Sequence, residues 1–307
     1  MFINIWGKKI WYEIYGAEYK DTLLYLHGGP GASCLDFVNQ AKALSEKMKV
    51  VIFDQLGVLR SEAIAESESY SMEYQIEMIE ELRQLLGIEK WSILGHSYGG
   101  MLGVLYAYIH PNSIHKVILE CPTLCFEDSA KSTAEYLSEH IKNLNNKPAA
   151  ELCEKMKFTD YQDKTEVVLD LLTLLGYVTD MKLRNYLHGI SFQEYQMSMD
   201  TTDITDEMWS KADRHLMKLL ETQPMPDGPL QKRMQITDSF LPMLTKITAP
   251  ILLISGKYDP VCTKDQIEYI MKNAQNATLA IFEDSGHFPR IEEAKKYTNT
   301  ILGFFEI

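Results

Sequence analysis

The chain has 307 residues, of which 46% are hydrophobic and 24% are charged, a composition typical of soluble globular proteins. Its formal net charge of -13 argues against nucleic acid and anionic membrane surfaces as partners, and its apolar runs are far shorter than a membrane-spanning helix. The first residues lack the pattern of a signal peptide, and the five cysteines are scattered. We therefore expect a cytoplasmic protein with reduced thiols and no nucleic-acid or membrane partner, whose oligomeric state the sequence does not indicate.

Strand patterns dominate the first 122 residues. Segments 2–7 and 9–16 are rich in β-branched and aromatic residues, which predicts a hairpin with its turn at Gly7 and Lys8. Later apolar runs are continuous rather than alternating, which predicts strands buried on both faces of a mostly parallel sheet. These runs cover residues 22–26, 50–57, 91–97 and 116–122.

Helical patterns lie between the strands. Residues 71–87 place apolar side chains on one helical face, with Ser71 as the expected N-cap and Gly87 as the stop. Similar patterns follow later strands at residues 98–111, 264–274 and 290–307. Strands that alternate with helices in this way are typical of a doubly wound α/β sheet.

The alternation is interrupted between the two halves of this sheet. Strand patterns disappear after residue 122, and amphipathic helical stretches replace them at residues 127–144, 164–178 and 204–220. Strands return with apolar runs at residues 250–259 and 278–287. We predict one α/β core, made of residues 1–122 and 241–307, with residues 123–240 inserted as a helical cap.

The first chemical motif is Gly-His-Ser-Tyr-Gly at residues 95–99, between an apolar strand and a helical segment. In this context the pattern G-x-S-x-G is typical of a nucleophile elbow, a strained turn that presents its serine hydroxyl. The flanking residues must be small to avoid the neighbouring backbone. The alternative is a glycine-rich joint without chemistry. We predict that Ser97 is a nucleophile.

A serine nucleophile needs a base to take its proton and a carboxylate to orient that base. Asp259 and His287 each follow an apolar strand, in the chain order Ser, acid, His that this arrangement uses. The carboxyl ends of parallel strands meet at one edge of a sheet, so we predict a catalytic triad of Ser97, Asp259 and His287. The alternatives are that Asp259 caps a turn or the helix beginning near Thr263, and that His287 is a buried structural histidine.

A glycine-rich segment, His-Gly-Gly-Pro-Gly at residues 27–31, follows the strand at 22–26. Its glycines allow backbone N–H groups to approach a carbonyl oxygen closely, as an oxyanion hole requires. We predict the N–H groups of Gly29 and Tyr98 as the donors, and Gly28 and His96 as residues that contact the substrate. No metal ion or organic cofactor is expected.

These motifs together resemble the α/β-hydrolase superfamily, and within it the prolyl aminopeptidase (proline iminopeptidase) family of serine peptidases. The matching motifs are HGGPG, DQLG, GHSYGG, GKYDPV and SGHF, and they cover about residues 20–122 and 240–307. The resemblance implies an α/β-hydrolase fold and hydrolysis of short peptides with an N-terminal proline or small residue. Asp54 and Gln55 of the DQLG motif are expected to hold a loop by local hydrogen bonds.

The chain departs from this family at two positions. Leu59 stands where the family has a second glycine, and Pro260 stands where many members carry a glutamate that binds the substrate's α-amino group. The alternative substrates are therefore carboxylesters, lactones or small amides, and a non-catalytic binding module on the same fold is a third hypothesis. Either a solvated helix surface or amine recognition could explain the acidic residues of the cap, which include Glu127, Asp128, Glu135, Glu139 and Glu194.

Overall fold

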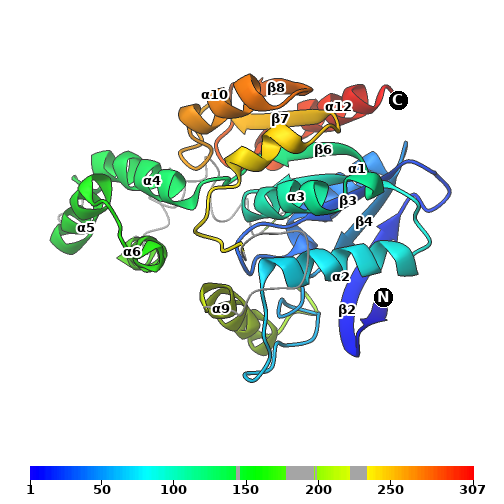
Figure 1. Cartoon of the computed structure of the whole chain (residues 1–307), viewed down its shortest axis with the longest axis horizontal. Helices are drawn as coiled ribbons and strands as arrows, with labels where there is room; N and C mark the ends of the chain where they lie inside the picture. The colour runs from blue at the N-terminus through cyan, green and yellow to red at the C-terminus, as the bar shows by residue number, and fades with distance from the viewer. Residues whose placement is uncertain (143–145, 178–196, 198, 222–233) are drawn as a thin grey trace.

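The computed structural model describes residues 1–142, 146–177, 197, 199–221 and 234–307. One eight-stranded sheet crosses the molecule in the order β1-β2-β4-β3-β5-β6-β7-β8, with helices on both faces (Figure 1). The β1–β2 and β2–β4 pairings are antiparallel and the other five are parallel, which confirms the predicted mostly parallel, doubly wound sheet. The strands are β1 (Phe2–Ile5), β2 (Lys8–Tyr15), β3 (Thr22–Leu26), β4 (Lys49–Phe53), β5 (Trp91–His96), β6 (Ile114–Glu120), β7 (Ile251–Gly256) and β8 (Ala277–Phe282).

The continuous apolar runs form the interior of this sheet. Every residue of β3, β5 and β7 is buried, as expected for parallel strands covered on both faces. The predicted hairpin forms, but its turn lies one residue earlier, at Trp6 and Gly7, because Ile5 pairs with Lys8. Trp6 and Gly7 have φ values of 53° and 85°, and positive φ at both turn residues matches the twist of the flanking strands.

Two hydrophobic cores separate the sheet from its helices. α2, α3 and α10 pack on one face, and α1 and α12 pack on the other. Ser71 caps α2 as predicted, since its side chain accepts a hydrogen bond from the N–H of Tyr74. The predicted C-terminal helix is two helices, because Glu293 leaves the helical conformation with φ -124° and ψ 48°. The core helices are α1 (Val38–Leu44), α2 (Met72–Leu85), α3 (Tyr98–Ile109), α10 (Lys264–Asn273), α11 (Pro289–Glu292) and α12 (Ala294–Phe305), with 3₁₀ turns η1 (Cys34–Phe37), η2 (Pro111–Ser113) and η3 (Leu241–Lys246).

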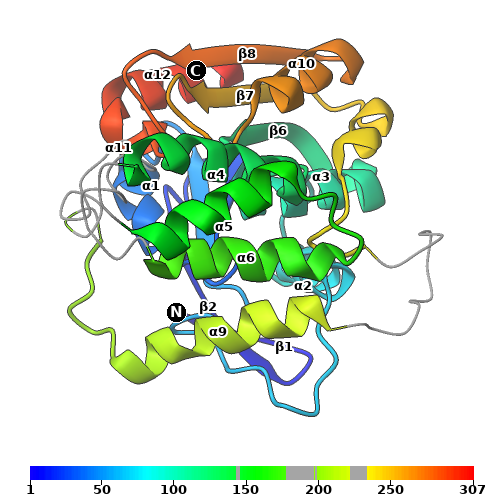
Figure 2. The same ribbon diagram turned by 90° about the vertical axis from the view of Figure 1, so that its left-hand side faces the viewer.

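Four further helices lie between β6 and β7 within the described residues: α4 (Phe126–Ile141), α5 (Lys147–Phe158), α6 (Lys164–Tyr177) and α9 (Asp206–Leu220). α4, α5 and α6 share a hydrophobic core of their own and stand together to one side of the sheet (Figures 1 and 2). α5 was not predicted from the sequence. Glu194, one of the acidic residues of the predicted cap, lies outside the described residues. Within the described part of the chain, no helix has the length and apolar composition to cross a bilayer.

α9 packs against the loop that joins β4 to α2. The Lys211 ammonium donates to the backbone carbonyls of Leu59 and Ser61, at 2.8 and 2.9 Å. α9 also approaches the glycine-rich segment after β3, since a Cβ added to Gly31 would lie 2.9 Å from the Cβ of Ala212. Gly31 has a φ of +90°, so this close approach also requires glycine's conformational freedom. α9 therefore supports two loops at the carboxyl edge of the sheet.

Candidate active site

Ser97 lies in the tight turn between β5 and α3. Its φ of 53° and ψ of -118° are unusual for a residue with a side chain, and its N–H donates to the Glu120 carbonyl at 3.0 Å. A Cβ added to Gly95 would lie 2.2 Å from the Gly99 carbonyl oxygen, and one added to Gly99 would lie 2.0 Å from that of Leu26. The backbone therefore leaves no space for a larger residue on either side, as the elbow pattern predicts.

Asp259 and His287 form a hydrogen-bonded pair at the same edge of the sheet. The Nδ1 atom of His287 is 3.0 Å from Oδ1 of Asp259, and the two side chains are 6% and 0% exposed. The Asp259 carboxylate also accepts N–H groups of Val261 and Cys262, at 2.9 and 3.3 Å. Burial alone would raise the pKa of Asp259, but the charge and hydrogen bond of His287 lower it below its ordinary value. An ionised Asp259 accepts the proton on Nδ1, which leaves the basic lone pair on Nε2.

The contacts of Asp259 distinguish a helix-capping role from a turn-stabilising role and an orienting role. α10 is capped by Thr263, whose side chain accepts the N–H of Gln266, so Asp259 is not its cap. Asp259 does stabilise its own turn through the N–H of Val261, in addition to pairing with His287. A turn-capping role and an orienting role are therefore compatible in this residue.

Two contacts bring His287 close to the elbow. Nε2 of His96, the residue before Ser97, lies 3.0 Å from the His287 carbonyl oxygen, and the two rings are 4.8 Å apart. The Ser97 hydroxyl lies 3.3 Å from the hydroxyl of Thr123, which follows β6. Thr123 was not singled out from the sequence, because a threonine after a strand has no distinguishing local pattern. His96 thus contacts His287, and its predicted contact with substrate stays a prediction.

The glycine-rich segment after β3 lies against the elbow. A Cβ added to Gly28 would lie 3.2 Å from the Cβ of Ser97 and 3.0 Å from Nδ1 of His96. Gly29 has a φ of +113°, a conformation that favours glycine. Tyr98 begins α3, so its N–H is one of the helix's unpaired N-terminal donors, while its buried hydroxyl accepts from Gln75 at 2.8 Å. This arrangement can supply two N–H donors beside Ser97.

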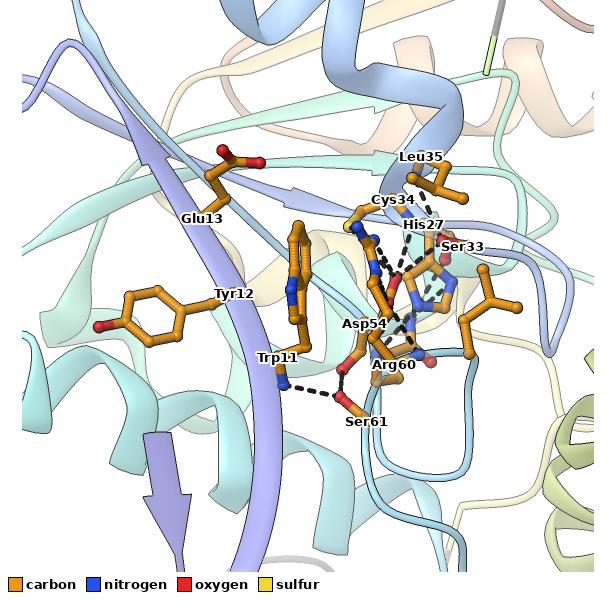
Figure 3. Close-up of polar contacts among 12 residues, drawn as sticks. Trp11, Tyr12, Glu13, His27, Ser33, Cys34, Leu35, Asp54, Arg60 and Ser61 are labelled. Carbon is orange, nitrogen blue, oxygen red and sulfur yellow. Dashed lines mark hydrogen bonds and ion pairs between the residues drawn. The ribbon is translucent and has the colours of Figure 1, made fainter. Parts of the chain in front are cut away.

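A buried ion pair in the loop after β4 holds that loop against the loop that follows β3. Nε of Arg60 lies 2.6 Å from Oδ2 of Asp54, and the Ser33 hydroxyl donates to Oδ1 at 2.7 Å (Figure 3). The Arg60 guanidinium also stacks 3.2 Å from the ring centroid of Trp11. Burial alone would raise the pKa of Asp54, but the bond to Arg60 holds it below its ordinary value. The structural role predicted for Asp54 is therefore confirmed.

Gln55 joins the same two loops. Its backbone N–H donates to Nε2 of His27 at 3.1 Å, and its side-chain amide donates to the His27 carbonyl at 3.2 Å. Burial lowers the pKa of His27, which favours the neutral ring that this acceptor role requires. His27 and Gln55 therefore have structural contacts, as predicted for Gln55.

The two departures from the family pattern are both buried. Leu59 is 1% exposed and has a φ of 34°, so a leucine adopts the backbone conformation that a glycine would favour. Its side chain belongs to a small apolar cluster with Leu35 and Val58, against which the cap residues Met199, Ile204 and Met208 pack. Pro260 is buried beside Asp259 and provides no carboxylate.

Two of the acidic cap residues are engaged in ion pairs on helix surfaces. Glu127 lies 2.7 Å from the Lys131 ammonium and 2.6 Å from that of Lys164, and Glu139 lies 2.7 Å from that of Lys142. Burial would raise the pKa of Glu127, but its two lysines lower it. These contacts favour the solvated-helix interpretation for Glu127 and Glu139.

One group of described side chains has the composition of a metal site. Ligand atoms of Cys121, Asp259 and His287 all lie within 4.8 Å of one another. Burial raises the pKa of the Cys121 thiol well above its ordinary value, which favours the protonated form over a thiolate ligand. Asp259 is already paired with His287, so we assign this group to the acid–histidine pair.

Comparison with known proteins agrees with this fold. Residues 21–294 match the family described as the alpha/beta hydrolase fold, and the chain belongs to that family. It is therefore an enzyme of the α/β-hydrolase superfamily, as the motifs indicated.

Individual relatives give a closer comparison. The chain is 28% identical to a proline iminopeptidase from Saccharolobus solfataricus, over 99% of this chain and 91% of that protein. Its fold matches the crystal structure of a proline iminopeptidase from Mycobacterium smegmatis with a TM-score of 0.68 at 15% identity, covering 100% of this chain and 97% of that one. It also matches an esterase from Exiguobacterium antarcticum with a TM-score of 0.65 at 20% identity, covering 100% and 99%. The resemblance to prolyl aminopeptidases thus extends over nearly the whole chain.

Proposed function

We propose that this enzyme is a serine hydrolase that forms an acyl-enzyme on Ser97 and releases an N-terminal proline or small residue from short peptides. The observation that carries the proposal is the buried 3.0 Å pair of Asp259 and His287 beside the strained Ser97 turn. The full-length similarity to proteins named proline iminopeptidase supports the peptide substrate. The free cysteines suit the cytoplasm as its setting.

The proposed reaction begins when Ser97 Oγ attacks the carbonyl carbon of the first residue, and Nε2 of His287 takes the hydroxyl proton. Asp259 holds the imidazole through Nδ1 and stabilises its positive charge. The N–H groups of Gly29 and Tyr98 donate to the oxyanion. His287 then protonates the leaving amine as the C–N bond breaks. A water molecule, deprotonated by His287, attacks the acyl ester and releases the amino acid and Ser97.

The proposed cap, residues 123–240, covers the carboxyl edge of the sheet and closes the substrate pocket, with Gly28 and His96 at its floor. A second candidate substrate is a carboxylester, lactone or small amide. Pro260 favours this second candidate, since a buried proline cannot bind an ammonium group as a glutamate does. The two candidates differ in whether the pocket requires a free, positively charged amino group.

A substrate panel tests the proposal and separates the candidates. Proline and alanine arylamides, with free and with blocked amino groups, are compared with short p-nitrophenyl esters. Ser97→Ala is expected to lower kcat/KM by about 10⁴-fold or more on every hydrolysed substrate. Ser92 is a buried serine in β5, the strand that precedes Ser97, and Ser92→Ala is the matched control that should retain activity.

The outcomes separate the two candidate substrates and test the serine mechanism. Hydrolysis of free-amino arylamides that is lost on blocking supports the aminopeptidase, and hydrolysis of esters alone supports the second candidate. Hydrolysis that survives in Ser97→Ala, or no hydrolysis and no labelling of Ser97 by a fluorophosphonate probe, would contradict a serine hydrolase.

A further inference from the structure

The loop between β8 and α11 carries His287. The carboxylate of Glu292 accepts hydrogen bonds from backbone N–H groups of this loop. The N–H of Gly286 lies 2.9 Å from Oε2 and 3.1 Å from Oε1 of Glu292, and the N–H of Phe288 lies 3.3 Å from the same Oε2. The N–H groups of the two residues that flank His287 therefore converge on one oxygen. Hydrogen bonds from N–H groups to a carboxylate are stronger than those to a neutral acceptor.

His287 is restrained from three directions as a result. Its ring is paired with Asp259, its carbonyl oxygen faces Nε2 of His96, and its two flanking N–H groups face Glu292. A base must be held within a fraction of an ångström of the proton it removes, and a displacement of 1 Å can lower a rate by about 100-fold. The carboxylate of Glu292 restrains the backbone on which that position depends.

Burial and nearby charges both affect the pKa of Glu292. Burial raises the pKa of Glu292 to about 7, against the stabilising N–H groups of Gly286 and Phe288. The charge of His287 opposes this rise and that of Asp259 adds to it. Its neighbour Glu293 points to other partners, with the Lys296 ammonium 3.0 Å away.

We propose that Glu292 is a positioning residue for His287, which fixes the orientation of the base by accepting the N–H groups on both of its sides. This proposal rests on the proposed function, because it takes His287 to be the base that serves Ser97. Glu292 acts through His287 and not on substrate, so it should govern the rate of the chemical step rather than substrate binding.

Glu293 offers a matched control in the same loop. It accepts the N–H of Asp284 at 3.2 Å and the Ser285 hydroxyl at 2.7 Å, which are two or more residues from His287. Both glutamates therefore stabilise the same loop, but only the contacts of Glu292 adjoin the base. Loss of general loop stability should affect both variants, whereas loss of positioning should affect only Glu292→Ala.

The experiment compares Glu292→Ala, Glu292→Gln and Glu293→Ala with the wild-type chain. The readouts are kcat and KM on the best substrate, the rate at which a fluorophosphonate probe labels Ser97, and the thermal unfolding midpoint. Glu292→Ala is expected to lower kcat and the labelling rate by about 10- to 100-fold with KM nearly unchanged. Glu293→Ala should lower the unfolding midpoint and leave kcat within about 2-fold.

Glu292→Gln provides the rescue. Because Oε2 receives both N–H groups, one amide oxygen can replace it, and kcat should recover to within about 3-fold of wild type. Recovery of kcat in Glu292→Gln would show that an acceptor oxygen at this position, and not its charge, holds the base.

The outcomes separate this proposal from the proposed function. If the wild-type chain neither hydrolyses the panel nor labels at Ser97, the proposed function fails, and this inference falls with it. If the wild type is active, equal kcat and labelling rates in folded Glu292→Ala and wild type would overturn the positioning role alone. Equal losses of kcat in Glu292→Ala and Glu293→Ala, or a kcat of Glu292→Gln no higher than that of Glu292→Ala, would also overturn it.

Discussion

Arg290 donates from Nη1 to Oε1 of Glu120 across 3.0 Å, and neither side chain has any exposed surface. A second buried carboxylate, that of Asp36, accepts from Nη2 of the same guanidinium at 2.5 Å. The hydroxyl of Tyr297 completes the group by donating to Oε2 of Glu120 at 2.9 Å. This network joins the end of β6, whose Glu120 carbonyl accepts the N–H of Ser97, to α11, which follows His287.

Arg290→Leu should therefore destabilise the fold strongly. The substitution leaves the Asp36 and Glu120 carboxyls buried without a cation, and breaking a buried pair from one side costs about 3–5 kcal/mol. The measurement is the free energy of unfolding in urea. Lys257→Met is the control, since Lys257 and Glu283 form an exposed pair, and its unfolding midpoint should stay near that of wild type. An Arg290→Leu variant within about 1 kcal/mol of wild type would contradict this account.

At Leu59 we expect a glycine variant to be at least as stable as an alanine variant, which reverses the usual order of these two residues. Its φ of 34° strains any residue with a Cβ, while its buried side chain packs in an apolar cluster. Leu59→Ala loses the packing and keeps the strain, whereas Leu59→Gly loses the packing and relieves the strain. We expect Leu59→Gly to be at least as stable as Leu59→Ala in urea unfolding, although glycine elsewhere is about 0.5–1 kcal/mol less stable than alanine.

A glycine-to-alanine substitution in a helix tests whether the positive φ of Leu59 causes the reversed order of stability. Gly303 lies within α12, and a Cβ added there would meet no atom within 4 Å. Gly303→Ala should raise the free energy of unfolding by about 0.5–1 kcal/mol, in the ordinary direction. If Leu59→Ala were the more stable Leu59 variant by a similar margin, the strain at Leu59 would not be significant.

The sequence predicted the parts of the site that follow local or topological rules. Ser97 is recognisable because the elbow has steric demands on residues two before and two after it, and Asp259 and His287 because parallel strands end at one edge. The sheet followed in the same way, because continuous apolar runs suit strands covered on both faces. The hairpin turn was misplaced by one residue, since only the pairing of Ile5 with Lys8 determines its register.

Other residues around the site have no local signal. Arg290 and Glu120 are 170 positions apart, and the sequence shows two ordinary charged residues until the fold buries them together. Glu292 and Thr123 are similar, since their importance comes from the N–H groups and the hydroxyl that tertiary structure places against them. α5 was missed although Asn146 caps it, because its apolar face only acquires a partner when α4 and α6 pack around it.

Thr123→Val tests the hydroxyl that lies 3.3 Å from Ser97 Oγ. Valine keeps the branched shape and removes the hydrogen bond, which we expect to orient the nucleophile. The loss of one such bond corresponds to about 0.5–1.5 kcal/mol, so kcat/KM should fall about 2- to 10-fold. Thr123→Ser keeps the hydroxyl and should retain more activity than Thr123→Val. The reverse order would show that the Thr123 methyl group matters and its hydroxyl does not.

His215 should make the protein sensitive to mild acid. It is fully buried in α9, and burial lowers its pKa to about 4. The Leu56 carbonyl lies 2.8 Å from Nδ1 and can only accept, so Nδ1 carries the proton of a neutral ring. Nε2 is buried with no hydrogen-bond partner among the described residues, so a second proton there would be an unpaired charge. Tyr70 packs against the ring, with centroids 5.2 Å apart, and adds no counter-charge.

The sign of the effect follows from the lowered pKa. The unfolded chain takes up a proton on His215 near pH 6.5 and the folded chain only near pH 4, so stability is lost as the pH falls between these values. Between pH 7 and pH 5 this amounts to about 2 kcal/mol of the free energy of unfolding. His215→Asn keeps a donor for the Leu56 carbonyl and cannot titrate, so its loss of stability over this interval should be smaller by that amount. Urea unfolding at the two pH values measures both variants, and an equal loss in both would show that another group causes the acid sensitivity.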